Sequence, residues 1–230
     1  LALGVGANTA IFSVLNGVVL RPLPFERADR LCMVWETFRT VQRGSVSYLN
    51  FEDWKAQNRV FESLGGFFPK SHTLTGRGEP ERVLGGRVTS GFFATLQAQP
   101  ALGRLFRPSD DRPGAENVAV LTHSSWQRRF GGDPRIVGTA LTIDQMPFRI
   151  VGILRPDFHF GVGLEEAEIF TPTATDTVSH GMRGWPRLRV VARLRPAAAI
   201  EQAQAQMDQT QRWLADKYPE NAEIKHQLAH

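Results

Sequence analysis

The sequence contains six histidines, a residue type that serves as general base and as metal ligand near neutral pH. They are His72, His123, His159, His180, His226 and His230. None belongs to an HExxH pattern, which would place two zinc ligands and a general base on one helix. His123 precedes Ser124 and Ser125, but the GxSxG context of a serine nucleophile is absent. We therefore interpret this stretch as the start of a helix.

Two groups of carboxylates could also carry chemistry. One is Glu165, Glu166 and Glu168, and the other is Asp110 with Asp111. Paired carboxylates can act as acid and base or bind calcium. Neither group has the ligand spacing of an EF-hand, and both lie in loop-like sequence, so we interpret them as solvated faces. A hydrolase with a carboxylate pair stays open as a minor alternative.

The sequence gives little support for a phosphate-binding site or a metal site. No GxxxxGK[ST] motif occurs anywhere in the chain, so the sequence carries no P-loop ATPase. The one cysteine, Cys32, excludes an internal disulfide and a four-thiolate zinc site. It lies in a short apolar run, residues 31–35, that predicts a buried strand. We expect no catalytic site, no metal and no cofactor, and hence no enzyme.

Composition indicates a folded protein rather than a nucleic-acid binder. Apolar residues make up 42% and charged residues 22% of the 230 residues, as in ordinary globular domains. The formal net charge is only +4, and the arginines are spread along the chain without a basic block. We therefore expect no nucleic-acid partner.

The first twenty residues differ from the rest. Residues 1–20 contain no charged side chain, and a helix of that length would be about 30 Å long, the thickness of a bilayer core. Arg21, Pro22 and Pro24 follow and would end it. We predict that residues 1–20 are the C-terminal part of a first transmembrane helix and residues 21–230 an extracytoplasmic domain. A buried helix of a soluble protein is the alternative.

Small and polar residues recur within this stretch at spacings of three and four. The candidate packing positions are Gly6, Thr9, Ala10, Ser13, Asn16 and Gly17. In lipid, small residues let helices approach closely, and Asn and Thr form hydrogen bonds between helices. We predict that these residues pack against other membrane helices.

The remaining sequence predicts a mixed α+β fold. Strong helix signals cover 48–57, with Ser47 as its cap, and the segment from Ile200 to Leu214. Shorter helices are expected around residues 90–96 and 126–130. Strands are expected at 31–36, 67–75, 81–89, 118–121, 141–143, 148–153 and 187–194, with hairpins joining 67–75 to 81–89 and 141–143 to 148–153.

Several blocks, in order along the chain, resemble one known family. They are GVGANTAIFSV at 4–14, LRPLP at 20–24, SYxxFxDW at 47–54, PxLGRxF at 100–106, DD at 110–111, VAVLxHxxWQRRFGGDP at 118–134, VGIxxPxF at 151–158, RLRP at 193–196 and EQA at 201–203. Together these blocks resemble the MacB-like periplasmic core domain of ABC-transporter permeases of the acidobacterial duplicated orphan type. The run Ala197 to Ala199 departs from the family, whose members usually place Gly and a helix cap there.

The resemblance implies both a fold and a function. The fold would have a porter-like lobe and a smaller mixed-sheet lobe, inserted between the first and second membrane helices of a permease in the bacterial inner membrane. The folded domain would lie on the periplasmic side. ATP hydrolysis would belong to a separate nucleotide-binding subunit, which reaches this domain through the rest of the permease. Whether a second permease copy or a periplasmic partner protein also takes part stays open.

From these features we expect the extracytoplasmic domain of an ABC-transporter permease, which couples membrane-helix movement to export or release of a substrate outside the cytoplasm. The main alternative is a membrane-anchored extracytoplasmic binding or sensing domain that is unconnected with transport.

Overall fold

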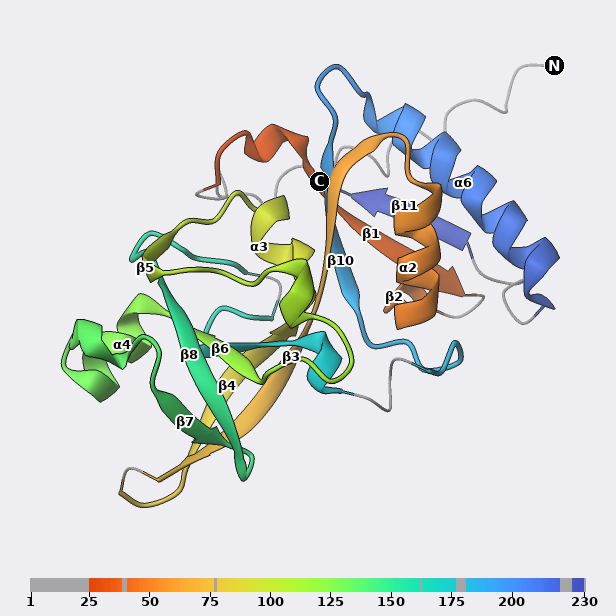
Figure 1. Cartoon of the computed structure of the whole chain (residues 1–230). Helices are drawn as coiled ribbons and strands as arrows, with labels where there is room; N and C mark the ends of the chain where they lie inside the picture. The colour runs from red at the N-terminus through yellow and green to blue at the C-terminus, as the bar shows by residue number, and fades with distance from the viewer. Residues whose placement is uncertain are drawn as a thin grey trace, which may run out of the picture.

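The computed structural model describes residues 25–38, 41–76, 78–161, 163–176, 181–219 and 225–229. Within these residues, eleven strands form one mixed sheet with helices packed against it (Figure 1). The predicted α+β class is confirmed.

The elements are as follows along the chain. The strands are β1 (Leu31–Phe38), β2 (Val41–Gly44), β3 (Phe61–Thr75), β4 (Glu81–Val88), β5 (Pro100–Gly103), β6 (Val118–Leu121), β7 (Ala140–Ile143), β8 (Met146–Leu154), β9 (Ile169–Pro172), β10 (Arg189–Leu194) and β11 (Lys225–Ala229). The helices are α2 (Tyr48–Gln57), α3 (Gly91–Thr95), α4 (His123–Phe130) and α6 (Ile200–Lys217). Single 3-10 turns are η1 (Ala28–Arg30), η2 (Pro108–Asp110), η3 (Pro134–Ile136) and η4 (Thr173–Thr175).

The first lobe, the helix-covered lobe, is a sheet with two helices packed against it. Its strand order is β11–β1–β10–β3, and α2 and α6 lie against it on the right of Figure 1. Phe51 and Trp54 of α2 and Met207 and Leu214 of α6 share one buried cluster with Val190 of β10. Burial of these large apolar side chains holds both helices on the sheet.

The second lobe, the ring lobe, is a ring of six strands. β3 pairs with β4, β4 with β9, β9 with β6, β6 with β8, β8 with β7, and β7 with β3 again. The pairings β4–β9 and β6–β8 are parallel and the others antiparallel, so the lobe has the expected mixed sheet. Its apolar core contains Leu74, Val83, Ala119, Leu121, Leu141, Ile143, Phe148, Ile150, Ile153 and Ile169.

The long strand β3 belongs to both lobes. Its first half pairs with β10 of the helix-covered lobe, and its second half pairs with β4 and β7 of the ring lobe. A third buried cluster lies where the lobes meet and includes Phe67 of β3, Phe92 and Phe93 of α3, and Phe170 of β9. Strand and cluster together join the two lobes into one body.

Local signals explain the helix ends. The Ser47 hydroxyl accepts a hydrogen bond from the Asn50 N–H at 3.2 Å, so the predicted cap of α2 is confirmed. Helix α4 starts earlier than predicted, because Thr122 is its cap and Ser124 and Ser125 lie inside the helix. The predicted end of α4 is confirmed, since Gly131 adopts the left-handed conformation at φ 59°.

The predicted transmembrane helix, residues 1–20, lies outside the described residues. Of the helices that are described, none combines the length and the hydropathy needed to cross a bilayer.

Candidate functional site

The residues predicted to pack in the membrane cannot be located, because residues 1–24 lie outside the described part of the chain. The set Gly6, Thr9, Ala10, Ser13, Asn16 and Gly17 therefore stays a prediction. The other residues considered for chemistry have defined places in the fold.

The aspartate pair is structural. Asp110 accepts two hydrogen bonds from the Arg104 guanidinium, at 2.6 and 3.0 Å, and one from the Arg107 N–H at 2.7 Å. Partial burial opposes ionisation of Asp110, but these bonds outweigh it and lower its pKa. Asp111 accepts from the Ser90 N–H at the start of α3 and from the Thr173 hydroxyl in η4. Because both carboxylates hold chain segments together, the interpretation of a merely solvated face is wrong here.

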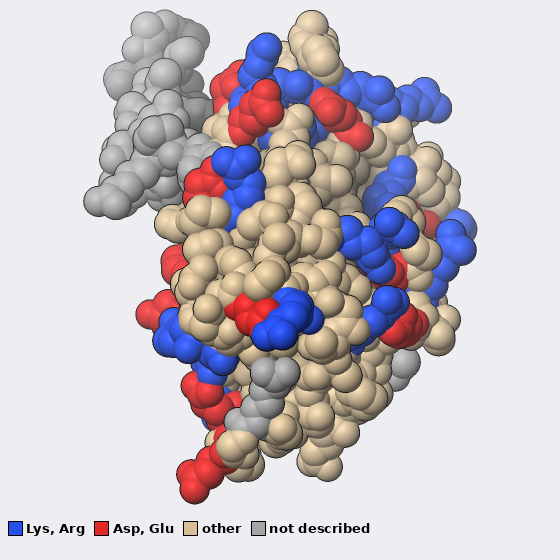
Figure 2. Space-filling view, turned by 60° about the vertical axis from the view of Figure 1, so that its left-hand side comes forward, with Lys and Arg blue, Asp and Glu red and all other residues tan. Residues whose placement is uncertain are grey.

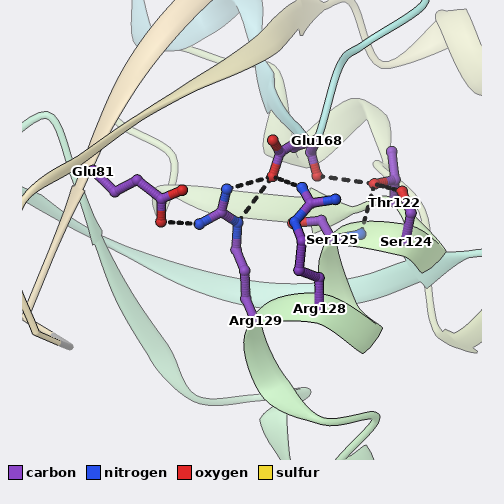
Figure 3. Close-up of polar contacts among 7 residues, drawn as sticks. All are labelled: Glu81, Thr122, Ser124, Ser125, Arg128, Arg129 and Glu168. Carbon is purple, nitrogen blue, oxygen red and sulfur yellow. Dashed lines mark hydrogen bonds and ion pairs between the residues drawn. The ribbon is translucent and has the colours of Figure 1, made fainter.

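The glutamate cluster separates into different roles. Glu168 pairs with Arg128 and Arg129 of α4, with N–O distances of 2.6 Å in both cases (Figure 3). Arg129 also pairs with Glu81 at the start of β4 and lowers the pKa of that carboxyl. The network thus connects α4 to β4 and to the segment before β9. Charge-assisted contacts of this kind are the stronger hydrogen bonds in proteins, so Glu168 holds α4 against the segment before β9.

The Thr122 side chain adds a second contact to the same segment. Its hydroxyl donates to the Glu168 carbonyl at 3.3 Å, and its oxygen accepts from the Ser125 N–H at 3.3 Å (Figure 3). The Thr122 and Ser124 hydroxyls are 3.2 Å apart. These serines serve the start of α4, as the sequence indicated.

The described histidines do not form a catalytic set. His72 is buried with its Nδ1 2.9 Å from an Asp144 oxygen, and burial lowers its pKa. His123 stacks edge to face on Trp126, and the His159 Nδ1 donates to the Phe158 carbonyl at 2.8 Å. Within the described ranges, no three His, Cys, Asp or Glu side chains gather closely enough to hold a metal ion.

Charged side chains are also dispersed on the surface. In the face that Figure 2 shows, Lys and Arg groups lie beside Asp and Glu groups instead of forming one patch of a single sign. Nucleic-acid binding depends on a concentrated positive surface, which this face does not offer.

A pocket is the feature that sequence reasoning missed. It has a volume of about 390 Å3 and lies between the start of α4 and the segment after β8. Its lining comes from three separate stretches: residues 122–124, 155–161 and 164–170. In the sequence, the close spacing of Phe158 and Phe160 is the one signal that could have indicated this pocket.

The first and the last described strands lie side by side. β1 begins at Leu31, and β11 pairs antiparallel with it, so that Met33 lies opposite Ala229. The C-terminal mark in Figure 1 accordingly lies beside the start of β1. The first strand of the described chain and its last strand are therefore neighbours in one sheet.

Comparisons with known proteins agree with this fold. The sequence model of the MacB-like periplasmic core domain matches residues 1–210. No curated protein sequence matches the chain.

Three solved structures have a similar fold. One is the extracellular domain of the noncanonic ABC-type transporter YknZ from Gram-positive bacteria, with TM-score 0.61, 15% identity and coverage of 86% of this chain and 99% of that one. Another is the periplasmic region of MacB from Actinobacillus actinomycetemcomitans, with TM-score 0.64, 12% identity and 92% coverage of each chain. The third is a domain of a putative permease protein from Porphyromonas gingivalis, with TM-score 0.66, 17% identity and coverage of 89% and 92%.

At these identities the solved structures support the fold alone. The family match supports membership of the family as well as the fold, because it covers 210 of the 230 residues and includes the sequence blocks that resemble the family. The chain belongs to the family of MacB-like periplasmic core domains.

Proposed function

We propose that this chain is the extracytoplasmic part of an ABC-transporter permease and couples movement of membrane helices to export or release of a substrate outside the cytoplasm. Family membership makes it a domain of a transporter permease. The observation that supports the mechanical part is the pairing of Met33 with Ala229, which makes the first and last described strands, β1 and β11, neighbours in one sheet.

The geometry suits a domain inserted between two membrane helices. Helices joined before residue 25 and after residue 229 would act on β1 and β11, which are neighbouring strands of one sheet. Relative movement of the two helices would therefore enter the domain at one place. β1 pairs next with β10, and β10 with β3, so the movement would pass through the helix-covered lobe into the ring lobe.

The membrane attachment belongs to the same proposal. Residues 1–20 would form the C-terminal part of the first transmembrane helix, with the set from Gly6 to Gly17 facing other helices, in the bacterial inner membrane. A separate nucleotide-binding subunit would supply the energy through the rest of the permease. This chain itself would do no catalysis, since its described carboxylates and histidines serve structural contacts.

The test is nucleotide-dependent movement in the complete permease with its ATPase in lipid nanodiscs. Spin labels go on exposed Gln209 of α6 and on the membrane-embedded part of the permease. We expect the distance between labels to change between the nucleotide-free and the ATP-vanadate states. A flexible six-residue insertion after Pro24 should abolish this change, because it disconnects the first helix from the domain.

A matched insertion after Gly76, in the turn between β3 and β4, is the control and should leave the movement intact. If the unmodified permease showed the same label-to-label distances with and without nucleotide, the coupling would be refuted. The alternative of a binding or sensing domain would then be favoured.

A further inference from the structure

The wall of the 390 Å3 pocket is aromatic. Phe160 and Phe170 are buried in it, and Phe158 is half-buried beside them. Phe158 and Phe170 meet edge to face with ring centroids 6.0 Å apart. Pockets of this size, mostly apolar with a few polar groups, are typical of small-molecule sites.

The rim of the pocket carries polar groups. The Arg155 side chain is 54% exposed and pairs with Asp157 through Nε alone, at 3.3 Å, so most of its guanidinium N–H groups are not used by that pair. The Ser124 hydroxyl and the ring of His159 also line the pocket. A cation and a hydroxyl above an aromatic wall match a ligand with an apolar body and one anionic group.

The carboxylate in the lining limits how much negative charge a ligand can bring. Glu165 lines the pocket, and its side chain accepts a hydrogen bond from the Gly163 N–H at 2.9 Å. A ligand with several negative groups would be repelled by this carboxylate. A monoanion with its charged group at Arg155 avoids that repulsion.

The pocket is connected to the point where the chain enters the domain. Phe25, the first described residue, has its ring 5.7 Å from that of Phe158 and 6.2 Å from that of Phe160. Phe160 in turn meets Phe67 of β3 and Phe92 of α3 edge to face, at 5.0 and 5.1 Å. A shift of Phe25 would therefore displace two rings of the pocket wall, since packed cores transmit displacement.

We propose that this pocket binds a small amphipathic carboxylate, with its apolar chain against Phe158, Phe160 and Phe170 and its carboxylate on Arg155. Because Phe25 packs on two of these rings, a displacement of Phe25 would change how well the pocket accepts the ligand. The binding site stands on the pocket alone, whereas its link to the membrane helix rests on the proposed function.

The test is calorimetric titration of the 230-residue chain with octanoate, and with octan-1-ol as the neutral probe of similar shape. We expect saturable octanoate binding that weakens about tenfold or more in Arg155→Gln, because a charge-assisted hydrogen bond is lost. Octan-1-ol binding should hardly change in that variant. Ser124→Trp places a large ring at the pocket mouth and should abolish binding of both probes, while thermal unfolding checks that the variant is folded.

Arg135→Gln is the matched control, since Arg135 also pairs with an aspartate two residues away but does not line the pocket. Equal octanoate affinities in Arg155→Gln and Arg135→Gln would overturn the assignment, as would unchanged binding in Ser124→Trp or no binding of octanoate at all. None of these titrations involves ATP, so their failure would leave the nucleotide-dependent movement untouched. Conversely, a permease without that movement could still bind octanoate.

Discussion

Glu36 on β1 is a buried carboxyl, with only 1% of its surface exposed. Burial raises its pKa to about 7, although the Asn50 amide donates to it at 2.7 Å and Arg183 lies near enough to favour its charge. Arg183 itself is held by Asn50 and Asp53 and lies over the Tyr218 ring. The cost of burying this charge makes the stability of the helix-covered lobe dependent on pH.

The sign of that dependence follows from the raised pKa. The folded state binds the Glu36 proton more tightly than the unfolded state, so this contribution to stability is present below pH 4.5 and is lost as the pH rises through about 7. We expect Glu36→Gln to raise the free energy of unfolding at pH 8 by up to about 3 kcal/mol relative to the parent, and by much less at pH 4.5. Urea unfolding at both pH values measures this.

Exposed Glu79, mutated to Gln, is the control and should show no such difference between the two pH values. A Glu36→Gln variant that is destabilised equally at both would mean that the carboxylate itself is needed.

Arg129 is a second residue whose contacts allow a definite prediction. Its side chain is 12% exposed and holds Glu81 and Glu168, which come from different elements (Figure 3). We expect Arg129→Met to lower the free energy of unfolding by about 1–3 kcal/mol, because it leaves a partly buried carboxylate with one partner fewer. Arg135→Met, at a pair whose arginine is 88% exposed, should leave the free energy of unfolding almost unchanged. Equal losses of unfolding free energy in the two variants would mean that the network contributes no more than ordinary surface ion pairs.

At the scale of elements, sequence patterns predicted those parts whose signals are local. Ser47 before α2, Gly131 after α4 and the apolar period of α6 all act within a few residues, and these helices are confirmed. The hairpins β3–β4 and β7–β8 are confirmed for the same reason, since each depends on a short turn.

Elements that depend on distant partners were missed. β9 has only four residues, ends at Pro172, and pairs with β4 and β6, which lie far away in the sequence. β5 starts with a proline and pairs only along its short length with β8. Such strands exist because neighbours complete their hydrogen bonds, and no local pattern reveals that.

β3 is longer than predicted for a related reason. It starts at Phe61, not at 67, and includes Gly65 and Gly66, which weaken any strand signal. A Cβ at Gly65 would lie 2.5 Å from the Cα of Phe92, so the glycine is what lets α3 approach the strand.

We expect Gly65→Ala to lower the free energy of unfolding by about 1–3 kcal/mol, which thermal unfolding would register as a Tm lower by several degrees. Gly184 is the control, because a methyl group added there would have no atom within 4 Å among the described residues, so alanine should be tolerated. Similar Tm losses in both variants would contradict the close packing of α3.

At the scale of the whole molecule, the family resemblance predicted more than periodicity could. It indicated two lobes, and the structure has them, joined by β3 and by the phenylalanine cluster. The pocket was not foreseen, because His123, Arg155 and Phe170 come together only when the ring of strands closes. The membrane-packing set from Gly6 to Gly17 stays a prediction, since it lies outside the described residues.

The central claim is that the folded domain lies outside the cytoplasm, and a labelling experiment on the complete permease tests it directly. Gln209 on α6 is exposed and is replaced by cysteine. The native Cys32 should not interfere, because it is 3% exposed and burial raises its pKa to about 12. The parent permease, without the new cysteine on this domain, is the control.

We predict that a membrane-impermeant maleimide modifies the Gln209→Cys permease in intact spheroplasts to the same extent as after lysis, and that the parent shows no modification of this domain in either case. Modification of Gln209→Cys only after lysis would place the domain in the cytoplasm and contradict the account.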